Sequence, residues 1–120
     1  MVPIAFEIKQ GDRRPVFVVV LKDDFGEPSE SIVNLTTATG VVFNMWKTAD
    51  KAVKVNRGSA AITNAAGGEV TYNWGTADTS EFGAFQCEVE VLWNDGKPET
   101  FPGGPAGGSY WDVTITDDIA

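Results

Sequence analysis

The chain has 120 residues, which gives room for one domain built around one hydrophobic core. With 42% hydrophobic and 22% charged residues it has the composition of a globular protein, which argues against disorder in the body of the chain. The net charge of −8, from 17 acidic and 9 basic residues, argues against DNA or RNA binding, because the few cations are scattered rather than gathered on one face.

Reactive side chains are scarce. There is no histidine and a single cysteine, Cys87, so an intramolecular disulfide, a Cys/His zinc cluster and a Ser–His or Cys–His pair are all impossible. Glu88 and Glu90 would share one strand face at a spacing of ~7 Å, but on an open, solvated sheet nothing would raise either pKa for glycosidase chemistry. We therefore expect no enzymatic activity, and Cys87 is expected to be a small buried residue.

No metal, cofactor or membrane is expected either. The acidic pairs at 23–24 and 117–118 suggest calcium, but adjacent strand residues point to opposite faces and no Asp-x-Asp-x-Asp spacing brings oxygens together. Residues 1–10 lack the basic start and apolar run of a signal peptide. No stretch approaches the ~20 apolar residues of a membrane helix, so we expect a soluble protein made in the cytoplasm.

Strand patterns dominate the first half of the chain. Residues 4–8 alternate with period two, and residues 16–22 form a β-branched run too short for an independent helix. Turn residues at 23–28 separate this run from the next strand. The remaining strands expected in this half span residues 32–35, 41–47 and 52–56, with a hairpin-like break at 48–51.

The second half repeats this pattern. Residues 85–93 form the clearest amphipathic strand, with Phe85, Cys87 and Val89 on one side and glutamates on the other. Asp95 and Gly96 predict a tight hairpin turn, and residues 76–80 a one-turn helical crossing between sheets. Residues 102–109 form a Gly/Pro-rich loop that is expected to be flexible. The other strands expected here span residues 59–63, 69–74, 97–101 and 110–116.

About seven to nine short strands, without any helical period longer than one turn, predict a sandwich or a barrel in a single domain over residues 1–120. The segment from Thr79 to Cys87 resembles the approach to the sixth strand of an immunoglobulin domain, which favours an immunoglobulin-like antiparallel β-sandwich. Phe85 stands where that fold has a tyrosine, so a hydroxyl-anchored corner is not expected at this position. The inter-sheet disulfide is also absent, since Cys87 has no partner.

Six segments in order along the chain resemble a known family. They span residues 6–15, 21–26, 35–45, 68–74, 83–91 and 99–102. Together they resemble the N-terminal domain family of phage baseplate upper proteins and the short stand-alone phage proteins related to it. The resemblance implies a β-sandwich in a tail, baseplate or other virion assembly, with no chemistry to carry over. Baseplate upper proteins continue into a further region, whereas this sequence stops at Ala120.

Apolar residues on outward strand faces are the candidate site. If Phe17, Val19 and Leu21 face the core, then the alternating positions face outward, where a solvated sheet would carry polar residues. An exposed apolar stripe usually marks a contact surface, although a loop covering it is an equally good reading. The candidate subunit-interface residues are Val16, Val18, Val20, Val42 and Trp46.

The function expected is therefore structural: a multi-copy component of a tailed-phage virion, in the tail or baseplate, with other virion proteins and further copies of itself as partners. The N-terminal strand or arm at 1–10 and the loop at 102–109 would order on assembly. A head-decoration or head–tail junction role remains open. A rival of a different class is a carbohydrate-binding module that uses exposed tryptophans, although Trp74, Trp93 and Trp111 are expected in the core.

Overall fold

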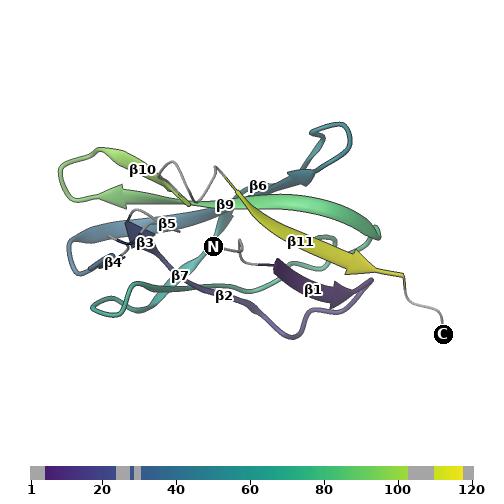
Figure 1. The fold of residues 1–120 in the computed structure, drawn as a ribbon, viewed down its shortest axis with the longest axis horizontal. Helices are drawn as coiled ribbons and strands as arrows, with labels where there is room; N and C mark the ends of the chain where they lie inside the picture. Colours follow the sequence, from purple (N-terminus) through teal and green to yellow (C-terminus); the bar gives the residue numbers. More distant parts are fainter. Residues whose placement is uncertain (1–4, 24–27, 29–30, 103–109, 118–120) are drawn as a thin grey trace.

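The structure, a computed structural model, describes residues 5–23, 28, 31–102 and 110–117, and in this part of the chain every regular element is a β-strand (Figure 1). The strands are β1 (Ala5–Lys9), β2 (Phe17–Val20), β3 (Lys22–Asp23), β4 (Ser31–Ile32), β5 (Ala38–Lys47), β6 (Val53–Ser59), β7 (Ala61–Asn64), β8 (Glu69–Tyr72), β9 (Gly83–Trp93), β10 (Pro98–Phe101) and β11 (Trp111–Thr116).

Two sheets form the sandwich. The larger, sheet A, has the order β1-β11-β9-β5-β6, with β10 also pairing with β9, and the smaller, sheet B, has the order β2-β8-β7. All pairs are antiparallel except β1 with β11, which run parallel. This is the strand arrangement of the immunoglobulin fold. Here β2, β8 and β7 take the places of its second, fifth and fourth strands, and β5, β9 and β11 those of its third, sixth and seventh. The expected all-β, immunoglobulin-like sandwich is therefore confirmed.

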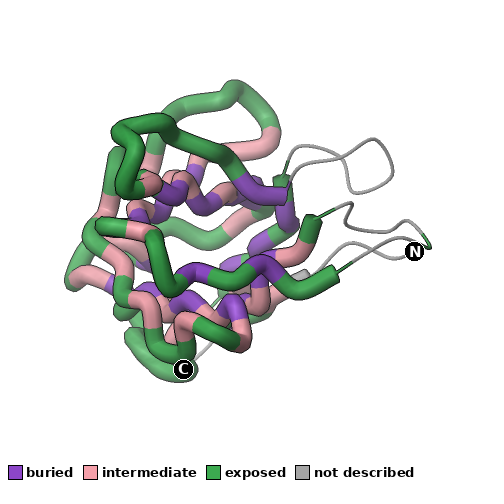
Figure 2. Tube along the Cα trace, turned by 90° about the vertical axis from the view of Figure 1, so that its left-hand side faces the viewer, coloured by how far each residue is buried: buried purple, intermediate pink, exposed green. Residues whose placement is uncertain are grey.

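The alternation in the sequence decides which residues face the core. In β5, Val41, Phe43 and Met45 are buried while the residues between them are partly exposed. In β2, Phe17 and Val19 are buried and Val18 is exposed. Because successive side chains of a strand point to opposite faces, each strand gives one apolar face to the space between the sheets. Figure 2 shows the result, with buried residues along the inside of the trace and exposed ones along the outside.

Aromatic rings from both sheets meet in the core. The ring of Phe17 in sheet B lies 5.2 Å from that of Phe43 in sheet A and 6.1 Å from that of Trp111. Phe43 in turn stacks on Tyr72 at 4.3 Å and meets Trp74 edge-on at 5.7 Å. Such contacts join the two sheets, because each ring buries a large apolar area against rings from the opposite sheet.

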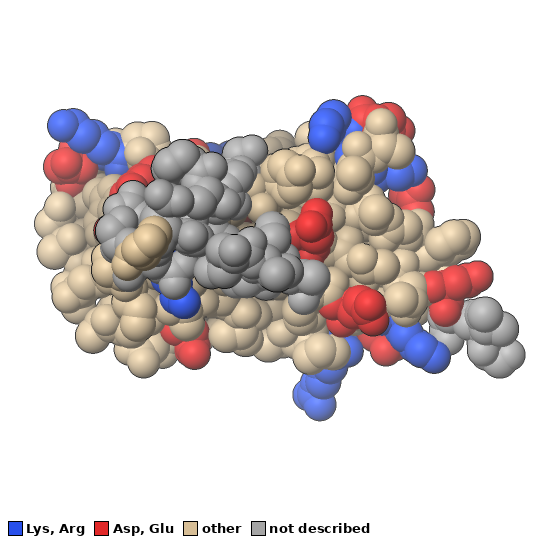
Figure 3. Space-filling view, in the orientation of Figure 1, with Lys and Arg blue, Asp and Glu red and all other residues tan. Residues whose placement is uncertain are grey.

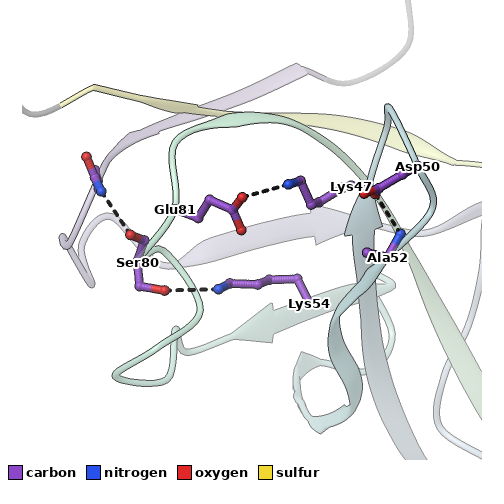
Figure 4. A network of polar contacts seen from close by, with 7 residues as sticks. Lys47, Asp50, Ala52, Lys54, Ser80 and Glu81 are labelled. Carbon is purple, nitrogen blue, oxygen red and sulfur yellow. Dashed lines mark hydrogen bonds and ion pairs between the residues drawn. The ribbon is translucent and has the colours of Figure 1, made fainter.

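The chain crosses from sheet B to sheet A through residues 73–82, and polar contacts fix this crossing. Glu81 pairs with Lys47 of β5 at 2.6 Å, and Ser80 accepts a hydrogen bond from Lys54 of β6 (Figure 4). On the inner side, the Tyr72 hydroxyl donates to Asp78, whose carboxylate also accepts from the Gly75 amide. The crossing therefore ties β8 of sheet B to β5 and β6 of sheet A.

Several details differ from the sequence expectation. Eleven strands are present in the described part: the run expected at 16–22 is interrupted at Leu21, with a two-residue strand at 22–23, and the strand expected at 32–35 is instead a two-residue strand at 31–32. Residues 76–80 form consecutive turns, so the helical turn expected there was wrong. The hydroxyl-anchored corner absent at Phe85 is supplied by Tyr72 and Asp78 instead.

The expected arm and loop are only partly described. Ala5–Lys9 already pairs with β11, so residues 5–9 are not a free arm awaiting a partner. Residues 1–4 and 103–109, which carry the rest of those two expectations, lie outside the described residues. The predicted hairpin turn is confirmed: Gly96 has φ of 83° and the amide of Trp93 bonds the carbonyl of Lys97.

Candidate functional site: apolar positions on the outer sheet faces

Val16, Val18 and Val20 lie along the outer side of sheet B, as the alternation predicts. Val18 is 47% exposed, and Val16 and Val20 are half-buried. Their neighbours on β8 are polar, since Val18 pairs with Thr71 and Val20 with Glu69. The three valines therefore form an apolar column at the rim of an otherwise polar face, which we call the β2 valine column.

Val42 and Trp46 lie on the outer face of sheet A and are both half-buried. The core lies between the two sheets, so this face is on the opposite side of the sandwich from the β2 valine column. The structure thus divides the five candidate residues between two separate surfaces. Whether either surface contacts another subunit stays a prediction.

Polar groups surround Trp46 on sheet A. Its indole N–H donates to Gln86 Oε1 at 2.9 Å, and the same oxygen accepts from Lys51 at 3.0 Å. Gln86 is buried on this face, 6% exposed, so its amide is held in place by these bonds. Trp46 is consequently part of a built polar cluster, and only part of its ring is available to a partner.

The glutamates of β9 follow on the same face. Arg57 pairs with Glu90 at 2.6 Å, and Asn44 donates to Glu88 at 3.4 Å. The expectation that nothing here would raise a glutamate pKa was wrong for Glu88: partial burial, together with repulsion from Glu90, raises its pKa, while the Asn44 bond opposes the rise. The two carboxylates have separate partners and do not converge on a shared space. The face offers charge and hydrogen bonds for recognition.

Sequence reasoning missed further exposed apolar residues. Leu92 of β9 lies beside Val42 around a small apolar hollow of about 130 Å³, which Arg57 and Glu90 also line. Val53 pairs with Trp46 and is 67% exposed, and Phe82 in the crossing is 55% exposed. The signal for Leu92 was available, because it has the same strand parity as Glu88 and Glu90.

The four tryptophans are not exposed platforms. Trp74 and Trp111 are buried in the core, as expected, whereas Trp93 is half-buried and donates its indole N–H to Glu99. Trp74 donates to the carbonyl of Pro15, and the indole nitrogen of Trp111 is buried without a partner. Two of the four rings are thus sealed in the core, and those of Trp46 and Trp93 are only partly exposed.

Chemically reactive groups are equally confined. Cys87 is fully buried, and burial raises the pKa of its thiol, so it is the inert core residue expected. Within the described residues no three His, Cys, Asp or Glu side chains gather where they could hold a metal ion. Nor does this part of the chain contain a helix of the length and hydrophobicity that crossing a membrane requires.

Charge is spread thinly over the surface. On the face seen in Figure 3 the Lys and Arg side chains lie apart from one another, most of them beside acidic residues. At the start of β2, Arg13 and Arg14 line a surface cavity of about 300 Å³ together with Val16 and Asn73. Arg13 also donates to the carbonyl of Trp74. This places two cations next to the β2 valine column.

Comparisons with known proteins bear on the fold alone. No family model matches the sequence, and no curated protein matches it. One solved structure of similar fold is CopC from Methylosinus trichosporium OB3b, with a TM-score of 0.51 over 97% of this chain and 87% of that one. The two sequences are 9% identical. The chain therefore shares a β-sandwich fold with CopC.

Proposed function

We propose that the chain is a structural component of a tailed-phage virion, in the tail or baseplate, which works by binding neighbouring subunits through its outer sheet faces. The observation that carries this proposal is the β2 valine column, where apolar side chains stand on a solvent-facing sheet rim. Exposed apolar surface of this kind commonly marks a contact between proteins.

The distribution of side-chain chemistry supports the same proposal. The one thiol is sealed in the core, and the hydroxyl that meets a lysine, Ser80 with Lys54, lies exposed on the crossing. What the described residues offer is a rigid two-sheet scaffold, apolar strips on both outer faces and separated charges around them. Such surfaces serve recognition by shape and hydrophobic burial. The phage assignment itself rests on the resemblance of six sequence segments to the baseplate family.

Quantitative mass spectrometry of purified particles tests this function. The particles are those of the phage that encodes the chain, and the readout is the copy number of this protein relative to the major tail and capsid proteins. We expect a fixed, whole-number stoichiometry that persists through density-gradient purification and in tail preparations freed of heads. Absence from particles would refute the proposal, whereas retention with heads alone would move the protein to the capsid or the head–tail junction.

A further inference from the structure

The β2 edge lacks the protection that other sheet edges carry. An open edge strand exposes backbone hydrogen-bonding groups and is normally guarded by charges, proline or bulges. In the described part of the chain, β1 carries Glu7 and Lys9, β6 carries Lys54 and Arg57, β10 begins with Pro98 and Glu99, and β6 and β7 pair with shifted register. β2 reads Phe-Val-Val-Val, without a charge, a proline or a register shift.

The backbone hydrogen-bonding groups that point toward this open edge belong to Val18 and Val20. The amide of Leu21 bonds the carbonyl of Gly68, directly beyond the β2–β8 register. In an antiparallel pair the bonded positions alternate, so Phe17 and Val19 also bond β8. The N–H and C=O groups of Val18 and Val20 therefore point away from β8, toward the open edge. The exposed valines and the free backbone groups belong to the same residues.

This arrangement is self-complementary. If two copies of β2 pair antiparallel about a two-fold axis at Val18, Val18 lies opposite its own copy, and Val16 lies opposite Val20 of the other copy. All six valines then lie on one face of a continuous sheet, where directly opposed side chains pack against each other. A register shifted by one residue would place inward and outward side chains opposite each other, which the two-fold symmetry forbids.

Charge at the two ends of the strand distinguishes the antiparallel from the parallel pairing. Arg13 and Arg14 precede β2, and Asp23 ends β3, all three being exposed. Antiparallel pairing about Val18 sets Arg13 opposite Asp23 of the other copy and Arg14 opposite Lys22, one pair of opposite charges and one of like charges at each end. Parallel pairing would instead set like ends together. Opposite charges across neighbouring strands favour a pairing and like charges oppose it.

We propose that two copies of this chain join through the β2 edges, antiparallel about a two-fold axis at Val18, so that their three-stranded sheets become one six-stranded sheet. The inference rests on the proposed function and names a second copy of the chain as the partner of the β2 valine column. In an assembly with many copies, even a weak β2–β2 pairing is reinforced by the other contacts that each subunit makes.

Disulfide trapping tests the pairing and its register. Directly opposed, hydrogen-bonded residues have Cα atoms ~5.5 Å apart, within the Cα range of a disulfide, and because their Cβ atoms are ~5 Å apart a short bifunctional thiol reagent is used beside mild oxidation. The full-length V18C variant should therefore form a covalent dimer under mild oxidation, and the buried Cys87 should not interfere. The matched control is V20C, whose two copies would lie ~13 Å apart and should crosslink at least about tenfold less. Equal crosslinking of both variants, or none of V18C, would overturn the proposed pairing.

Sedimentation velocity over a concentration series supplies the second readout. The wild type should dimerise, and V18K should weaken dimerisation at least about tenfold, because two like charges would then face each other across the axis. T76K adds the same charge at an exposed position of the crossing, away from both outer sheet faces, and should dimerise like the wild type. Circular dichroism establishes that both variants are folded. A wild type that stays monomeric, or a V18K variant that dimerises normally, would contradict the inference.

The two proposals fail in different ways. If V18K is monomeric and absent from particles while T76K is incorporated, both proposals gain support. If V18K enters particles at normal copy number, the chain is still a virion component but β2 pairing is not what holds it there. If wild-type protein pairs in solution and is missing from particles, the pairing stands and the virion function falls.

Discussion

The hydrogen bond from Tyr72 to Asp78 shows how one side chain can fix a crossing between sheets. Tyr72 is buried at the end of β8, and its hydroxyl reaches the Asp78 carboxylate at 2.5 Å. Burial, followed by the bond to Asp78 and the negative charge of that carboxylate, raises the pKa of Tyr72 above its ordinary range. The neutral, proton-donating hydroxyl is thus the form that the fold stabilises.

Replacing this hydroxyl tests its contribution. Y72F should lower the free energy of unfolding by about 1–2 kcal/mol, because a partly buried carboxylate loses its hydroxyl donor and keeps only the Gly75 amide. Urea unfolding at pH 7 measures the change. Y110F, at an exposed tyrosine, is the control and should change stability by less than about 0.5 kcal/mol.

The same variant should alter the pH dependence. Above about pH 10 the unfolded chain releases the tyrosine proton while the folded chain retains it, so the stability of the wild type falls as pH rises. Y72F lacks this group and should lose less stability from about pH 10 upward, since the loss in the wild type continues until the raised pKa of the folded state is reached. Cys87 is present in both proteins and its contribution cancels. Identical slopes for the two proteins would show that Tyr72 titrates normally in the fold.

At the scale of the element, β6 can lie close to sheet B only where its own side chain is small enough. β6 crosses over Tyr72 at Gly58, where an added Cβ would lie 2.7 Å from Val55 Cγ1 and 2.8 Å from Tyr72 Cε1. Both of those side chains are buried and cannot move aside without displacing the core. β6 can therefore lie this close to sheet B only with glycine at position 58.

G58A should consequently destabilise the fold by about 1–3 kcal/mol, the usual cost of overpacking a core. Its matched control is G40A in β5, where nothing lies within 4 Å of the added Cβ. That variant should unfold at the wild-type urea concentration or slightly above it, since glycine weakens a strand interior. If both variants behaved alike, the close packing of β6 on Tyr72 would be refuted.

Strand faces were predictable from the sequence and strand partners were not. The period-two pattern assigned Phe17, Val19 and Phe43 to the core, because side-chain alternation is a local property. The outward positions of Val18 and Val42 followed from the same rule. The parallel pairing of β1 with β11 joins residues more than a hundred positions apart, and no local pattern encodes it.

The candidate site was predictable to the same degree. Sequence parity identified the valines of β2 as outward, but it could not reveal that β2 is an edge strand or that Trp46 bonds Gln86. Both facts depend on which strands become neighbours. The bounds of the two-residue strands β3 and β4 were also missed, since the strands expected at 16–22 and 32–35 overlap each of them by one residue and two residues are too few to show a period.

At the scale of the whole molecule, the two sheets depend on each other. Each presents its apolar face only to the other, and Phe17 of sheet B contacts rings of β1, β5 and β11, all in sheet A. Separating the sheets would expose both apolar faces to water, which is unfavourable. The sandwich should therefore unfold as one cooperative unit, as small single domains usually do.

F17A tests this dependence between the sheets. Removing a fully buried ring that touches both sheets should cost about 3–5 kcal/mol, through lost burial and the cavity left behind. Because the sheets share that core, tryptophan fluorescence and far-ultraviolet circular dichroism should report one coincident, lowered transition. F82A, at a phenylalanine 55% exposed in the crossing, should change stability by less than about 0.5 kcal/mol. Separate transitions in the two signals would mean that sheet A persists without sheet B, and the three strands of sheet B would then be an appendage on a self-sufficient sheet.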